Sequence, residues 1–189
     1  MASLAVCTAA AGTVTGIIRQ ASSNCKKAGG LKAIYVASES DIDKTASSAF
    51  YSDTTCQLSQ IAMVGTGKFV EIQTDGGETT FTSEKQDNGN YLNTVTMYFK
   101  GTSCARLCAI KQLDNVCPKV VFVQFADCSQ FISFEANGTN IVSSLESPDI
   151  TGDSMTAGTV EGDASSQTLT MTWLSSQSML CANMTTSPT

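Results

Sequence analysis

Apolar and polar residues alternate along several stretches of this chain of 189 residues. Leu169, Met171 and Trp173 are separated from one another by threonines. This period of two is typical of a β-strand that buries one face. Runs rich in β-branched and aromatic residues predict further strands at 28–37 and 91–99. The pattern therefore predicts a mainly β fold.

The segment 68–84 predicts a β-hairpin. Two strand-like runs, 68–74 and 79–82, flank an Asp-Gly-Gly sequence at 75–77. Because these turn residues readily adopt positive φ angles, they favour a tight reversal between paired strands. Alternation would give the hairpin one polar, acidic face, which comprises Glu71, Gln73, Asp75, Glu78 and Glu84.

Two further units extend the predicted antiparallel sheet. The Asp-Asn-Gly-Asn cluster at 87–90 precedes the strand at 91–99 and indicates a second hairpin-like unit. The run at 119–125 contains Val-Val-Phe-Val, which is typical of a strand buried on both faces. A turn at 126–129 joins it to another strand at 130–135, and we expect this pair at the centre of the sheet.

A single segment, at about 102–114, predicts an α-helix. Thr102 or Ser103 can cap its N-terminus, and Asn115 with Pro118 supplies the stop. Apolar side chains cover most of its circumference, so we expect cover from its own sheet on one side and from a neighbouring subunit on the other. The candidate intersubunit residues are Cys104, Leu107, Cys108, Ile110 and Leu113.

The remaining segments contribute less to the predicted core. Residues 1–27 indicate an N-terminal arm, and the polar segment 38–59 predicts a loop with little regular structure. Residues 140–189 are loop-rich and would complete the sheet. We expect one domain over residues 1–189, an antiparallel β-sandwich or barrel with one flanking helix.

Composition argues against several classes of function. The net charge is −6 and the pI about 4.5, whereas nucleic-acid binding requires clustered Lys and Arg. The chain has no histidine, which excludes Ser-His-Asp and Cys-His catalysis and Cys2His2 zinc sites. We therefore expect a protein that is not an enzyme, with no catalytic residue, metal or cofactor.

Eight cysteines are scattered without a CxxC pair. The N-terminus lacks the basic and long apolar regions of a secretory signal, so reduced thiols are favoured over disulfides. No run approaches the roughly 18 apolar residues of a membrane span, and we expect no membrane insertion.

An acidic cluster lies among glycines late in the chain. Its members are Asp149, Asp153, Glu161 and Asp163. Such oxygen-rich loops can bind calcium, but the EF-hand order of ligands is absent. Solvated loop carboxylates are the favoured interpretation.

The sequences GGLKAIYVA at 29–37, KFVEIQT at 68–74 and NYLNTVT at 90–96, with the stretch from 137 to 162, resemble tail tube proteins of tailed bacteriophages, particularly phages of Bacteroidetes-type hosts. The resemblance runs over most of the chain and lies in strand and turn patterns. It implies a β-sandwich or barrel with one flanking helix that stacks as hexameric rings into a hollow tube.

The resemblance also implies partners and a location. The partners would be copies of the chain itself and other tail proteins, in the virion tail and, during assembly, in the host cytoplasm. DNA would pass without specific binding, because an acidic lumen repels phosphates. The acidic hairpin face is the candidate lining, and the N-terminal arm and 38–59 are candidate contacts between rings.

Two alternatives remain open at this point. Another β-rich virion protein, such as a capsid decoration, tail terminator or tail tip protein, would share this composition. A secreted carbohydrate-binding β-sandwich with up to four disulfides is the other, and the number of free thiols separates it from the virion proteins.

Overall fold

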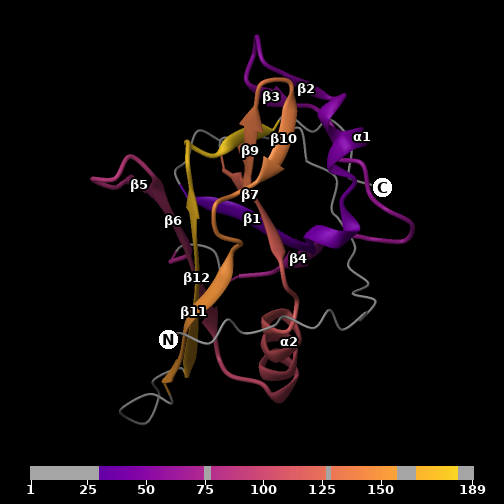
Figure 1. The fold of residues 1–189 in the computed structure, drawn as a ribbon. Helices are drawn as coiled ribbons and strands as arrows, with labels where there is room; N and C mark the ends of the chain where they lie inside the picture. The colour runs from indigo at the N-terminus through magenta and orange to yellow at the C-terminus, as the bar shows by residue number, and fades with distance from the viewer. Residues whose placement is uncertain (1–29, 75–77, 127–128, 157–164, 183–189) are drawn as a thin grey trace, which may run out of the picture.

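The computed structural model describes residues 30–74, 78–126, 129–156 and 165–182. Two main sheets and a small hairpin account for most of this chain (Figure 1). The seven-stranded sheet has the spatial order β2 (Tyr51–Ser52), β3 (Gln57–Leu58), β13 (Leu180–Ala182), β8 (Gln130–Ile132), β7 (Lys119–Phe125), β1 (Leu31–Ser38) and β4 (Val70–Ile72). The four-stranded sheet has the order β11 (Asp149–Thr156), β12 (Ser166–Ser175), β6 (Tyr91–Lys100) and β5 (Thr80–Lys85).

A separate pair, β9 (Phe134–Asn137) and β10 (Asn140–Ser143), forms the small hairpin. The pairings are antiparallel except that of β3 with β13, which is parallel. The predicted mainly β, antiparallel fold is therefore confirmed, and a sandwich describes it well.

The core between the two main sheets forms one half of the hydrophobic interior. The four-stranded sheet contributes alternate residues of β6 and β12, and the seven-stranded sheet contributes one face of β1 and β7. Trp173, Met171 and Leu169 are each at most 1% exposed, as their alternation predicts. Burial of these large side chains supplies much of the free energy that holds the sheets together.

The opposite face of the seven-stranded sheet is also buried. Tyr35 and Phe122 point to this side and pack with Phe134 and Ile141 of the β9–β10 hairpin and with Phe69. β1 and β7 therefore bury both faces, which explains the continuous apolar run of β7. The predicted interior position of β7 and its hairpin with the next strand are confirmed. The predicted strand 130–135 is divided, because β8 ends at Ile132 and Phe134 begins β9 of the small hairpin.

The predicted hairpin over 68–84 is wrong. β4 pairs with β1, with Ile72 opposite Ile34, whereas β5 pairs with β6 in the other sheet. The turn residues 75–77 lie outside the described residues. The local reversal signal did not decide the pairing, because β4 pairs with β1, more than 30 residues earlier, and β5 pairs with β6, the next strand along the chain. The second unit, from β5 through Gly89 to β6, is a hairpin as predicted.

The segment 38–59 holds more regular structure than the predicted loop. It contains a short 3-10 helix, η1 (Glu39–Asp41), a helix, α1 (Lys44–Ser48), and the strands β2 and β3. Asp43 caps α1 by accepting a hydrogen bond from the backbone N–H of Ala46 at 2.9 Å. Helices this short carry no apolar period, so the sequence pattern does not reveal them.

One ion pair fastens this segment to the small hairpin. Lys44 Nζ lies 2.5 Å from Glu39 Oε1 and donates to Ser143 Oγ of β10 at 2.9 Å. Ser143 in turn donates to the Glu39 carboxylate. This three-residue network holds η1 and α1 against β10.

The predicted helix is present as α2 (Cys104–Asp114). Ser103 caps it, accepting from the backbone N–H of Arg106 at 3.2 Å, and Asn115 ends it. Figure 1 shows α2 standing apart at one end of the seven-stranded sheet, below β4 and to the right of β11 in that view. The expectation of one helix is corrected only by the short helices α1 and η1.

Candidate functional site

A groove of about 410 Å³ lies between α2 and the edge of the seven-stranded sheet. We call it the β4–α2 groove. One wall consists of Lys68 and residues 70–73, on and beside β4, and the other of α2 residues that include Ala109, Ile110 and Leu113. It forms because α2 connects β6 of one sheet with β7 of the other and does not pack flat on either.

The floor of the β4–α2 groove is apolar. Val36 of β1, Phe99 of β6 and Leu169 of β12 all line it and all belong to the core between the sheets. The groove is therefore the place where the sandwich core reaches the surface. Ile72 and Ile110 are only partly buried there, and each packs against this core from one side.

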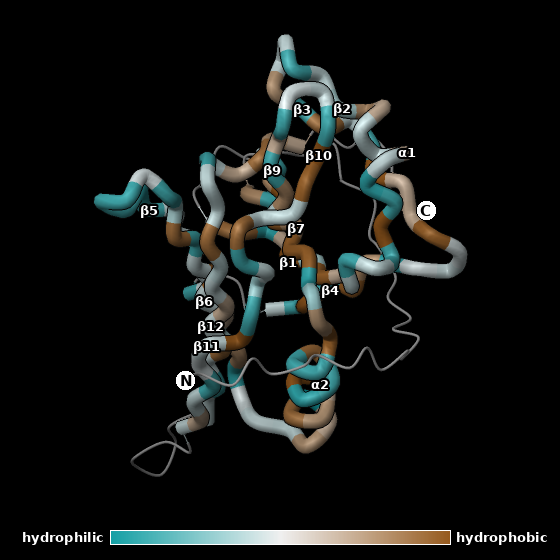
Figure 2. Tube along the Cα trace, viewed as in Figure 1, coloured by the Kyte–Doolittle hydropathy of each residue, from teal (hydrophilic) through white to brown (hydrophobic). Residues whose placement is uncertain are grey.

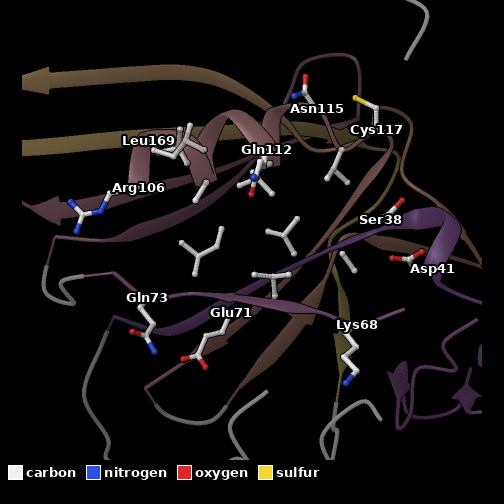
Figure 3. Close-up of a pocket in the computed structure, with 18 of the residues that line it drawn as sticks. Ser38, Asp41, Lys68, Glu71, Gln73, Arg106, Gln112, Asn115, Cys117 and Leu169 are labelled. Carbon is white, nitrogen blue, oxygen red and sulfur yellow. The ribbon is translucent and has the colours of Figure 1, made fainter. Parts of the chain in front are cut away.

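Charged and polar side chains surround the apolar floor, as Figure 3 shows for Asp41, Lys68, Glu71, Gln73 and Arg106. Arg106 already has partners. Its guanidinium donates to the carbonyl oxygen of Gly101 at 2.6 Å and lies 4.9 Å from the ring centre of Phe99. The acidic groups of the rim are the carboxylates of Asp41 and Glu71.

Asp41 is held at its end of the groove by close packing. A Cβ atom added to Gly67 would lie 2.6 Å from the Asp41 Cβ, so only glycine fits this approach. The Asp41 carbonyl accepts from the Val64 N–H at 2.8 Å. The turn at 64–67 thus fixes both the start of the β4 segment and the Asp41 carboxylate beside it.

The outer edge of β4 lies open along the groove. Within the described residues, β4 pairs with β1 on one side and has no strand on the other. An open strand edge presents backbone N–H and C=O groups that can pair with another chain. Backbone hydrogen-bonding groups and an apolar floor therefore occur side by side.

A second groove, of about 380 Å³, lies on the other side of α2. Leu107, Lys111 and Asp114 of α2 line it together with Ile150 and Asp153 of β11. β11 is the edge strand of the four-stranded sheet. α2 is therefore flanked by grooves that separate it from an edge strand of each main sheet.

The structure divides the predicted intersubunit residues of α2 between two settings. Ile110 and Leu113 are partly buried, line the β4–α2 groove and pack against the core. Cys104, Leu107 and Cys108 are exposed, and Leu107 lines the second groove. One side of the helix therefore packs in part against its own chain, and the contact of the other side with a neighbouring subunit stays a prediction.

The candidate lumen residues do not share one face, because the predicted hairpin does not form. Glu71 and Gln73 lie on the rim of the β4–α2 groove in the seven-stranded sheet. Glu78 and Glu84 are exposed, and Glu84 belongs to β5 in the four-stranded sheet. Asp75 lies outside the described residues. Figure 2 shows the β5 hairpin projecting from the body with a hydrophilic tip.

The sequence pattern does not reveal the residues that make the groove. Asp41 lies in the segment 38–59, which the sequence predicts to be a loop. Val70 lies in the predicted hairpin 68–84, which does not form. The alternation of Val70 and Ile72 was visible, but their partner strand, β1, lies more than 30 residues earlier. Only long-range pairing reveals that 68–73 form an edge.

The described residues offer few groups for chemistry. No cluster of three or more His, Cys, Asp or Glu that could hold a metal occurs among them. Asp149 pairs with Lys119, Asp153 accepts from Gln167, and Glu161 and Asp163 lie outside the described residues. Burial, with Cys56 and Asp53 nearby, raises the pKa of Tyr51, which does not line either groove. In the described ranges, no helix is long and apolar enough to cross a membrane.

Several thiols are open to solvent. Cys56, Cys104 and Cys108 are exposed and form no disulfide. Cys104 and Cys108 are four residues apart on α2, so they lie on the same side of the helix. Cys7, Cys25 and Cys128 lie outside the described residues.

No protein family model, no curated protein and no solved structure matches this chain. The function of the protein must therefore be inferred from its residues and from the geometry of the two grooves.

Proposed function

We propose that the protein is a virion structural protein, a tail tube subunit whose copies associate into stacked rings around a hollow conduit for DNA. The observation that carries self-association is the position of α2. All 11 of its residues are described, none is buried, and a groove lies on each side of it. A helix with so many apolar side chains gains stability when another surface covers it.

Open sheet edges support the same proposal. β4 ends the seven-stranded sheet beside α2, and β11 ends the four-stranded sheet on the other side of α2. Pairing between neighbouring subunits removes open edges from solvent and prevents uncontrolled aggregation. The resemblance of 29–37, 68–74 and 90–96 to tail tube proteins supports a closed ring as the form of assembly.

The proposed conduit is lined by the projecting β5 hairpin. Glu78, Glu84 and Asp87 are exposed there and Lys85 is the one cation between them, so the hairpin surface carries net negative charge. Such a surface repels DNA phosphates and lets the duplex slide. Glu71, on the groove rim, belongs in this arrangement to the contact between subunits.

The test is assembly of the purified protein over a range of concentrations. We expect negative-stain electron microscopy to show rings and hollow tubes of uniform width. Alkylation followed by mass spectrometry should show Cys104 and Cys108 reacting in the dilute subunit and protected in the assembly, with the urea-unfolded chain as the reference for full reaction.

Persistent monomers at every concentration would contradict the proposal. If Cys104 and Cys108 still react in the assemblies, the contact between subunits does not involve α2. Cys56 is exposed and lies in the segment 38–59, the candidate contact between rings. Its reaction with the alkylating agent should therefore fall when rings stack and should not change when single rings form.

A further inference from the structure

The N-terminal segment, residues 1–29, differs in charge from the rest of the chain. It contains Arg19, Lys26 and Lys27 and no Asp or Glu. Residues 30–189 contain eight Lys and Arg against 17 Asp and Glu, a net charge of −9. A basic segment attached to an acidic body is attracted to acidic surfaces of that body or of its neighbours.

The stretch 13–18, Thr-Val-Thr-Gly-Ile-Ile, has the strongest β propensity in this segment, because five of its six residues are β-branched. As a strand it would span roughly 20 Å. The wall of the β4–α2 groove extends from Lys68 to Gln73, and β4 itself, Val70–Ile72, is its central part. A strand at 13–18 is therefore long enough to pair with β4 and to reach both ends of this wall.

We infer that residues 13–18 of one copy add a strand to the open edge of β4 in a second copy and place aliphatic side chains in the β4–α2 groove. An extended segment that joins a sheet edge gains main-chain hydrogen bonds, and its alternate side chains enter apolar pockets. Val70 and Ile72 beside the edge, and Ala109 and Leu113 of α2, supply that apolar surface. The inference rests on the proposed function, since it specifies the contact through which copies associate.

The charges around the groove fit this occupant. Arg19 follows the inserted stretch directly, and the acidic groups of the rim are Asp41 and Glu71. Arg106 keeps its positive charge, but its guanidinium is directed to the Gly101 carbonyl oxygen and the Phe99 ring. Lys68 is the other cation on the rim (Figure 3).

The direction of the chain favours a second copy over the same copy. Because Ile34 pairs with Ile72, the start of β1 at Leu31 lies toward the Gln73 end of β4. By the shortest path, a chain's own residues 13–18 would run parallel to β4, and parallel pairs are slightly less stable per residue than antiparallel ones. The connecting residues 19–30 reach at most roughly 40 Å, which sets the greatest distance at which the groove of a second copy could lie.

The experiment uses two complementary variants of the full chain. Ala109→Arg places a long cation in the groove from an exposed position on α2, and Ala46→Arg on α1 is its matched control. Ile17→Asp combined with Ile18→Asp disables the inserted stretch, and Ser22→Asp combined with Ser23→Asp is the control for added charge. Circular dichroism and Trp173 fluorescence establish that each variant folds. Gln73→Arg, at the exposed rim, replaces Ala109→Arg if the latter fails to fold.

Sedimentation velocity measures assembly. We expect the wild type and both controls to assemble, and each of the two test variants to raise the dissociation constant at least tenfold. An equimolar mixture of the two test variants should form dimers and nothing larger, because only one intact stretch and one intact groove can meet.

The outcomes separate this inference from the proposed function. If the two test variants assemble like the wild type, or if their mixture stays monomeric, insertion into a second copy is overturned while self-association stands. If the wild type itself stays monomeric, the proposed function fails and this inference fails with it.

Discussion

The ammonium group of Lys119 lies 3.0 Å from the carboxylate of Asp149 and joins the two main sheets beside α2. The Lys119 side chain is fully buried, whereas that of Asp149 is 62% exposed. Lys119 also donates to the carbonyl oxygen of Asp114, the last residue of α2, at 3.4 Å. One buried cation therefore ties β7, β11 and the C-terminus of α2 together, and the helix dipole favours a cation at that end.

We expect Asp149→Ala to destabilise the protein by about 1–3 kcal/mol, because it leaves a buried ammonium group without its carboxylate. Urea unfolding followed by Trp173 fluorescence measures the loss. Glu146→Ala is the control, since Glu146 is exposed and its side chain makes no hydrogen bond or ion pair within the described residues. Equal midpoints for the two variants would show that the Lys119 contact does not join the sheets.

The close approach of Gly67 to Asp41 predicts a second effect. Gly67→Ala would bring a Cβ to 2.6 Å from the Asp41 Cβ and 3.0 Å from its carbonyl oxygen. We expect a loss of about 1–3 kcal/mol as the backbone shifts to relieve the clash. Gly152→Ala is the matched control, because its Cβ would meet Thr170 at an ordinary 3.5 Å. Thermal unfolding of the two variants should differ in midpoint, and similar values would contradict the tight packing at Gly67.

The turn of the β5–β6 hairpin depends on a positive φ angle. Gly89 has a φ of +87°, which residues with a side chain adopt only at a cost. We expect Gly89→Ala to lower the free energy of unfolding by about 1–2 kcal/mol. Gly89→Asn should lose less, because asparagine tolerates the left-handed region better. If Ala and Asn behave alike in urea unfolding, the hairpin turn differs from the one described.

The alternation in β12 predicts opposite outcomes for neighbouring residues. Met171 is fully buried between the sheets, and Thr172 is only partly buried on the other face. We expect Met171→Ala to cost about 2–5 kcal/mol, since it removes buried methylenes and leaves a cavity. Thr172→Ala should cost less than about 1 kcal/mol. Calorimetry of both variants checks the register, and a reversed order would mean a shift by one residue.

The proposed conduit predicts how charge controls DNA. Glu78→Lys combined with Glu84→Lys would turn the β5 hairpin surface from acidic to basic. We expect assembled tubes of this variant to retain duplex DNA at low salt, with an affinity that falls steeply as salt rises, and wild-type tubes not to retain it. Fluorescence anisotropy measures binding, and Asp53→Lys combined with Glu146→Lys is the control. Equal DNA retention by the two double variants would place the β5 hairpin outside the conduit.

The strands of this protein were easier to predict than their partners. The alternation in β12 and the apolar run of β7 indicate burial directly, because side-chain period and burial are local properties. The Asp-Gly-Gly signal at 75–77 suggested a hairpin, yet β4 and β5 belong to different sheets. Pairing depends on which strand, often distant in sequence, lies beside a given strand in the sheet. β4 pairs with β1.

The candidate site was predictable only in part. The caps and composition of α2 predict the helix and its many apolar side chains, and all of that information is local. The β4–α2 groove requires residues from segments around positions 40, 70, 110 and 169 to meet. No short sequence pattern indicates that such distant segments lie together. Asp41 and Ala109 can therefore be recognised as groove residues only from the three-dimensional arrangement of the strands.

The two strands nearest the end of the described chain occupy interior positions. β12 lies between β11 and β6, and β13 lies between β3 and β8. While the nascent chain is still on the ribosome, both sheets lack an inner member and expose edges where strands will later lie. Both sheets can therefore close only after residues 166–182 have been synthesised. A chain terminated before residue 166 would lack β12 and β13, and each main sheet would be missing an inner strand.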